Sequence, residues 1–175
     1  AENRAAPRTA EKEGNPWPNL YFSRENKGME YNFIGEKLEG YKPRFMLLIA
    51  DACNSLIPDA WAPPLQRRMF GRVIDEELLK QNYKHLFLET SGIIMVTSSE
   101  AGEPSWDTGV GGLYTRAFIE CLNQAVKSSA LPSWETLLDT SAMKIAGEEQ
   151  HPYYRIDLDI SSLVSRGQLG LDTSP

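Results

Sequence analysis

An unbroken apolar run constrains the fold of this chain more than any other feature. Residues 45–50, FMLLIA, follow Pro43 and Arg44 and end at Asp51. A run this short is typical of a β-strand, and apolar residues on both of its faces indicate helices on both sides, as in a parallel sheet. We therefore predict a strand over residues 44–51 and expect it to lie in the middle of a sheet.

Segments of helical and extended pattern alternate along the rest of the chain. A second apolar strand opens the stretch 92–100, and residues 153–160 alternate apolar and polar side chains, as an edge strand with one wet face does. Ser133 is a predicted N-cap and Gly147 a predicted helix stop. Helices are predicted over residues 31–40, 64–83, 113–127 and 133–147. This order indicates an α/β fold with a thin sheet of three strands.

Composition places the chain among ordinary soluble globular proteins. It has 175 residues, 41% of them hydrophobic, and a formal net charge of −6, which argues against a nucleic-acid partner. No apolar run approaches the ~20 residues of a membrane span, and no targeting segment is visible, so the localisation stays open. Of the two cysteines, Cys121 falls on an apolar helix face and is predicted to be core.

Cys53 follows the first apolar strand directly and is the candidate nucleophile. In open α/β sheets, ligands bind beyond the carboxyl ends of the strands. The polar stretch 97–100, TSSE, would lie at the end of the neighbouring strand. A reactive thiolate needs a nearby imidazolium or helix terminus, because Asp51 alone would disfavour it. The alternative is a cysteine that only packs at a strand end.

Three segments, in this order, resemble the caspase-like cysteine peptidases, closest to their metacaspase and bacterial branch. Asp-Ala-Cys is similar to the strand end that carries the family's catalytic cysteine. A strand, a polar loop and a Gly-Leu-Tyr-Thr helix start follow, and a Gln-x-Pro run precedes the last strand. The segments are LLIADACNS (47–55), IIMVTSSEAGEPSWDTGVGGLYTRAFIECL (93–122) and EEQHPYYRID (148–157), and the resemblance covers about residues 17–160.

The resemblance implies a caspase-like three-layer fold with a mostly parallel sheet, of which this chain supplies the later strands and helices. Residues 20–163 would be the C-terminal portion of the catalytic domain, with residues 1–19 an exposed loop or tail and 164–175 a loose tail. Neither tail shows apolar periodicity.

The resemblance also implies a cysteine endopeptidase that cleaves after Arg or Lys. Residues two apart in a strand point to the same side, so Asp51 and Cys53 would both face the substrate. Asp51 would pair with the basic side chain of the substrate, and Ser98 is a weaker candidate for lining the same pocket. The alternative is that Asp51 only accepts hydrogen bonds from loop amides.

The chain departs from the family in its histidines. A catalytic histidine about 50 residues before the cysteine would fall among the first residues, where there is none. His85 reads as a surface residue at a helix end, and His151 occupies the Gln-x-Pro run, which does not carry the family's base. We therefore expect an upstream portion of the same domain, joined or separately processed, to supply the histidine. The alternative is a non-catalytic caspase-like module.

No cofactor is predicted. Calcium activates some metacaspases, but Asp59, Asp157 and Asp159 do not form a recognisable ligand set. The glycines of GVGG, residues 109–112, lack the lysine and the spacing of a phosphate-binding loop. The expected partner is a peptide or protein substrate.

Overall fold

The computed structural model describes residues 19–22, 27–52, 75–100, 103–107, 109, 111–146 and 150–159. The predicted tails, apart from Asn19, lie outside these residues, as do Cys53, Asp59 and the first part of the helix predicted over 64–83. A short antiparallel pair, β1 (Asn19–Phe22) and β2 (Lys27–Glu30), opens the described part.

A three-stranded mixed sheet forms the centre of the fold. Its strands are β3 (Phe45–Ala50), β4 (Gly92–Thr97) and β5 (Tyr153–Leu158), in the order β3-β4-β5. β3 and β4 are parallel, and β5 is antiparallel to β4. All three strands were predicted from the sequence, and the α/β class is confirmed.

The position of β3 differs from the prediction. Among the described residues, β3 pairs with β4 alone, and β4 is the middle strand. The burial of the strands follows this order, because four consecutive residues of β4 are fully covered while most of β3 is only half-buried. The helices above and below β3 account for the apolar residues on both of its faces, and this pattern does not tell how many strands lie beside it.

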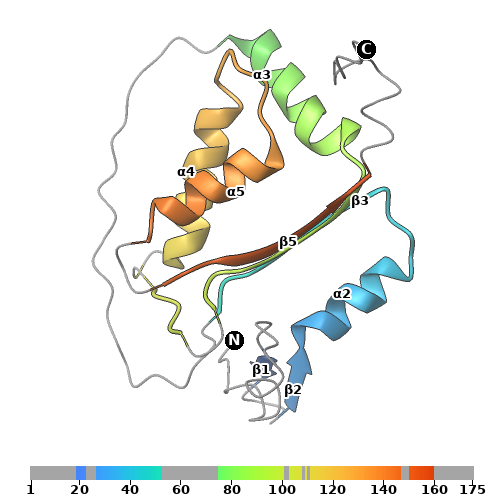
Figure 1. Cartoon of the computed structure of the whole chain (residues 1–175), viewed down its shortest axis with the longest axis vertical. Helices are drawn as coiled ribbons and strands as arrows, with labels where there is room; N and C mark the ends of the chain where they lie inside the picture. The colour runs from blue at the N-terminus through green and yellow to red at the C-terminus, as the bar shows by residue number, and fades with distance from the viewer. Residues whose placement is uncertain are drawn as a thin grey trace, which may run out of the picture.

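Helices cover both faces of the sheet, so the described part has three layers (Figure 1). One face carries α3 (Glu76–Tyr83), the π-helical turn η1 (Lys84–Glu89), α4 (Leu113–Ala125) and α5 (Trp134–Met143). The other face carries α2 (Tyr31–Glu39). None of these helices, taken over the described residues, is long and apolar enough to cross a bilayer.

The alternation of β3 divides its side chains between two apolar clusters. Phe45, Leu47 and Ile49 pack toward α4 and α5, whereas Met46 and Ala50 pack with Tyr31 on the α2 side. Continuing this alternation one step past the strand puts Asp51 on the side of α4. The larger cluster contains Cys121, which is buried with a free thiol and so confirms its predicted core position.

The termini of the helices follow ordinary capping chemistry. Asp75 caps α3 by accepting bonds from the amides of Glu77 and Leu78, and Ser133 caps α5, as predicted, through the amide of Thr136. The predicted end of α5 was wrong: the helix stops at Met143, before Gly147. Ile145 is buried nonetheless, in the turn that follows.

Candidate functional site

The candidate site lies at the carboxyl ends of β3 and β4. The parallel ladder extends one residue beyond the strands, because the amide of Ser98 donates to the carbonyl of Ala50 at 2.9 Å. Beyond this point Ser105, from the segment after β4, lies next to Asp51, and so does the first turn of α4. Three separate segments of the sequence thus converge on one carboxylate.

Asp51 accepts one hydrogen bond on each carboxylate oxygen. The hydroxyl of Ser105 donates to Oδ1 at 2.7 Å, and the amide of Thr115 donates to Oδ2 at 3.0 Å. Thr115 is in the first turn of α4, whose N-cap Gly112 has no side chain to offer, so Asp51 caps this helix from another element. This is the amide contact that the alternative interpretation of Asp51 expects. Among the described residues neither oxygen accepts a second hydrogen bond, which leaves each a lone pair.

Gly112 is required by space rather than by backbone conformation. A Cβ at this position would lie 1.9 Å from Oδ2 of Asp51, while the φ angle of −57° is open to any residue. The glycine therefore lets the helix start approach the carboxylate closely enough for the bond from Thr115.

Ser98 and Ser105 form a directed chain of hydrogen bonds toward Asp51. The amide of Ala52 donates to Oγ of Ser98 at 3.1 Å, and Oγ of Ser98 donates to Oγ of Ser105 at 2.7 Å. Ser105 donates its single hydroxyl proton to the carboxylate, so toward Ser98 it can only be the acceptor. Ser98 is thus linked to Asp51 through one intervening hydroxyl group, that of Ser105.

Gln150 lies directly behind these two serines and is fully buried. Its side-chain amide nitrogen donates to the carbonyl of Ser98 at 2.8 Å and to Oγ of Ser105 at 3.3 Å. Its side-chain oxygen accepts from the amide of Trp106 at 3.0 Å. One side chain from the segment before β5 therefore holds both ends of the stretch from Ser98 to Trp106.

Glu103 links the loop after β4 to the segment before β5. Its carboxylate accepts from the amide of Glu100 at 3.2 Å and from the amide of His151 at 2.8 Å, and it lies 2.6 Å from Nδ1 of His151. Burial acts to raise the pKa of Glu103, but hydrogen bonds from His151 and Glu100 outweigh it and lower the pKa. The hydrogen bond with Glu103, and then its charge, raise the pKa of His151.

The two histidines lie at opposite ends of β4. The carbonyl of His85 accepts a bond from Thr90, two residues before the strand begins. His85 is thus separated from the candidate site by the strand length, about 16 Å at ~3.3 Å per residue. His151 shares the edge of the sheet with Asp51 and is engaged by Glu103.

The candidate nucleophile Cys53 lies outside the described residues, as does Asp59. Asp157 and Asp159, which were not predicted to bind calcium, are exposed along β5 and at its end. Within the part of the chain that the structure describes, no three His, Cys, Asp or Glu side chains are grouped as they would be around a metal ion.

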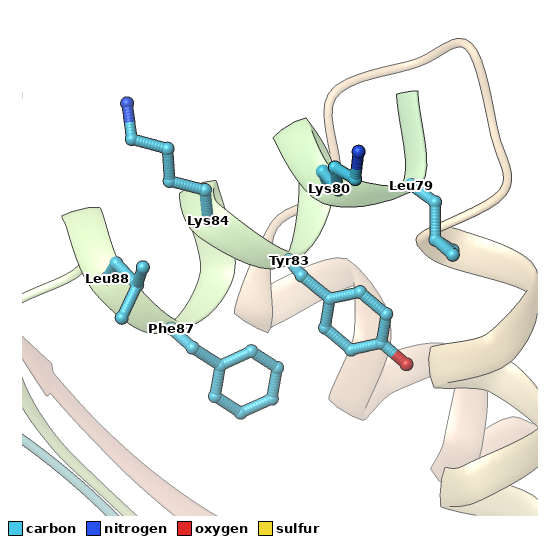
Figure 2. A pocket seen from close by; sticks show the side chains of 6 residues that line it. All are labelled: Leu79, Lys80, Tyr83, Lys84, Phe87 and Leu88. Atoms are coloured by element: carbon cyan, nitrogen blue, oxygen red, sulfur yellow. The ribbon is translucent and has the colours of Figure 1, made fainter. Parts of the chain in front are cut away.

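An apolar groove of about 500 Å³ lies away from this site, on α3 and η1. Figure 2 shows the rings of Tyr83 and Phe87 pointing to the same side of the helix, and they stack with centroids 6.0 Å apart. Phe87 also meets Phe45 at the amino end of β3. The groove is therefore at the other end of the strands from Asp51.

Sequence reasoning identified Asp51 and Ser98 but missed Ser105, Gly112 and Gln150 as their partners. The signal for Gln150 was available, because the Gln-x-Pro run is one of the three segments of the resemblance. Ser105 lies in a polar loop among several serines and glycines, and its sequence context alone does not distinguish it.

Comparison of the chain with family models, with curated proteins and with solved structures finds no match.

Proposed function

We propose that this protein is a cysteine endopeptidase that cleaves after Arg or Lys. Cys53 would be the nucleophile, and Asp51 would bind the basic side chain of the substrate. The observation that carries the proposal is the fixed carboxylate of Asp51, held by Ser105 and Thr115 two residues before Cys53. It lies at the edge of the sheet where α/β proteins bind ligands.

The hydrogen bonds of Asp51 suit it to a guanidinium. Ser105 and Thr115 each use one lone pair of a different oxygen, so a lone pair on each oxygen is left for a planar, two-pronged donor. A carboxylate already oriented by the protein loses little freedom on binding such a ligand. The ammonium group of a lysine would be attracted by the same charge, but it is a compact point charge and lacks the planar pair of donors that matches both oxygens.

The proposed reaction follows nucleophilic catalysis. The Sγ of Cys53, deprotonated by a histidine, attacks the carbonyl carbon of the peptide and forms a tetrahedral intermediate. The backbone amide of Cys53 would donate to the oxyanion. The histidine then passes its proton to the leaving amine as the C–N bond breaks, and water hydrolyses the remaining thioester.

The histidine is proposed to come from an upstream portion of the same domain. One observation supports this part of the proposal: His85 lies at the amino end of β4, at the other end of the strand from Asp51. A peptide or protein substrate and this upstream portion are the partners that the proposal requires.

Covalent labelling tests the proposal. The full-length protein is incubated with a peptidyl electrophile that carries Arg at the position before the reactive group, and the adduct is located by mass spectrometry. We expect a single adduct on Cys53. A folded protein whose Cys53 stays unlabelled would show that the peptidase proposal is wrong.

Replacing Asp51 with Asn tests its role in the pocket. The amide oxygen of Asn still accepts from Thr115, but the negative charge for a basic side chain is gone. Loss of one partner of a buried charged pair costs about 3–5 kcal/mol, so cleavage after Arg and Lys should fall by about two to four powers of ten. Turnover of basic peptides is the measurement.

A small uncharged alkylating agent provides the control for Asp51→Asn. Its reaction with Cys53 should persist or quicken, because a negative charge near the thiol has been removed. Loss of both reactions would mean that the end of β3 has collapsed. Near-normal turnover on basic substrates would return Asp51 to a purely structural role.

A non-catalytic caspase-like module is the second candidate. The cap that Asp51 provides for α4 favours it, since this contact stabilises the fold without any substrate. The gene upstream of Ala1 discriminates between the two candidates. A His-Gly pair at the end of a predicted strand there supports the enzyme, and a folded domain without it favours the module.

A further inference from the structure

We propose that Gln150 is a positioning residue for the Asp51 pocket. It would hold the stretch from Ser98 to Trp106 so that Ser105 orients the carboxylate toward the substrate. This inference rests on the proposed function. Gln150 itself would not touch the substrate, because its side chain is fully buried behind the serines.

The hydrogen bonds of Gln150 are directed at the two residues that matter for Asp51. Both amide protons are used, one on the carbonyl of Ser98 and one on the hydroxyl of Ser105, and the oxygen accepts from Trp106. A buried amide with all three groups paired stabilises one arrangement of the loop, because any other arrangement leaves polar groups unpaired.

The bond to Ser105 also fixes the direction of its proton. Oγ of Ser105 accepts from Gln150 at 3.3 Å and from Ser98 at 2.7 Å. With its acceptor sites occupied, its single proton is left for Oδ1 of Asp51, 2.7 Å away. Gln150 thus acts on Asp51 through Ser105, across a gap of about one hundred residues in sequence.

The test is a Gln150→Met variant of the full-length protein, which keeps the length of the side chain and removes its hydrogen bonds. Two rates of labelling of Cys53 are measured: one with the Arg-bearing peptidyl electrophile and one with the small alkylating agent. We expect the ratio of the first rate to the second to fall about tenfold or more, the factor expected when a hydrogen bond that orients a charged group is lost.

Asn82→Leu is the matched control. Asn82 is a second buried amide, and it donates to the carbonyls of Val126 and Ser128 in the turn after α4. Its replacement also removes a buried amide that holds a loop, but at a distance from Asp51. The ratio of the two rates should stay within about twofold of wild type, even where Asn82→Leu lowers the stability of the protein as much as Gln150→Met does.

Coupling between Gln150 and Ser105 distinguishes positioning from general support. Ser105→Ala should lower the ratio by a similar factor, and the double variant should lower it no further than the larger single effect. Gln150→Asn, whose amide is one methylene shorter, provides a second variant if Gln150→Met melts below the assay temperature.

Each outcome bears on the proposal. An unchanged ratio in a folded Gln150 variant, or additive effects with Ser105→Ala, would overturn the role of Gln150 and leave the peptidase proposal intact. A wild-type protein that the basic electrophile does not label would overturn the peptidase proposal, and this inference with it.

Discussion

The absence of a side chain at Gly112 determines how closely α4 approaches Asp51. The replacement Gly112→Ala puts a methyl group at a position 1.9 Å from Oδ2, so the carboxylate or the helix start has to move. We expect labelling of Cys53 by the Arg-bearing electrophile to fall by at least about tenfold, because a displaced carboxylate loses its bidentate geometry. The measurement is the same ratio of labelling rates.

Gly109→Ala is the control for this replacement, since it changes the same loop. A Cβ at Gly109 meets nothing within 4 Å. Its φ of +74° makes the alanine strained by about 1–2 kcal/mol, so any global loss of stability appears in this variant too. If Gly112→Ala and Gly109→Ala behave alike, closeness to Asp51 is not what Gly112 provides.

The strands and helices show what the sequence was able to predict. Sequence pattern was sufficient for the three strands, because short apolar runs predict β3 and β4 and the alternation of residues 153–160 predicts β5. It was not sufficient for neighbour relations. The order β3-β4-β5 depends on which backbone edges meet, and an apolar strand looks the same whether one strand or two lie beside it.

The candidate site was predictable to the same extent. Asp51 and Ser98 follow apolar strands directly, so a rule about strand ends finds them. Ser105 and Gln150 reach the site from a loop and from the segment before β5, 54 and 99 residues after Asp51 in the printed numbering. Only the pairing of β4 with β5 brings Gln150 next to Ser98.

The ion pair of Glu103 and His151 links the loop after β4 to the start of β5 and makes their attachment dependent on pH. The raised pKa of His151 contributes stability that is full below 6.5 and is lost as the pH rises through the folded-state value. The lowered pKa of Glu103 contributes stability that is full above 4.5 and is lost as the pH falls through its own folded-state value. Both contributions are present together between these two limits.

We therefore expect the melting temperatures of wild type and His151→Gln to differ most between pH 4.5 and 6.5, the ordinary values of the two groups. The difference should shrink toward about pH 9, where histidine is neutral. Glu103→Gln should reproduce this profile, and the nearby carboxylate of Glu100 is left in place in both variants. A difference that does not change with pH would show that the ion pair contributes nothing measurable.

Within the described residues, no strand lies along the outer edge of β3. Apolar side chains cover both faces of this strand, with Leu47 toward α4 and α5 and Met46 toward α2. In the described part of the chain its backbone is paired only with β4. An apolar edge with free amides and carbonyls is a template for a further strand, and the proposed upstream portion would fill that place.

Residues 1–175 expressed alone should therefore be insoluble or should associate. Size-exclusion chromatography with light scattering, run over a range of concentrations, is the measurement, and the mass should rise with concentration because strands of two copies pair along the open edge. Co-expression with the upstream portion provides the control and should give a single species of defined mass, since the edge is then occupied within one domain. Pairing is expected at β3 and not at the opposite edge. There β5 alternates half-buried with exposed residues and carries Arg155 and Asp157 on its exposed side, which discourages pairing. A monodisperse monomer of residues 1–175 that melts cooperatively would mean that the sheet is complete as it stands, and the need for an upstream strand would fall with it.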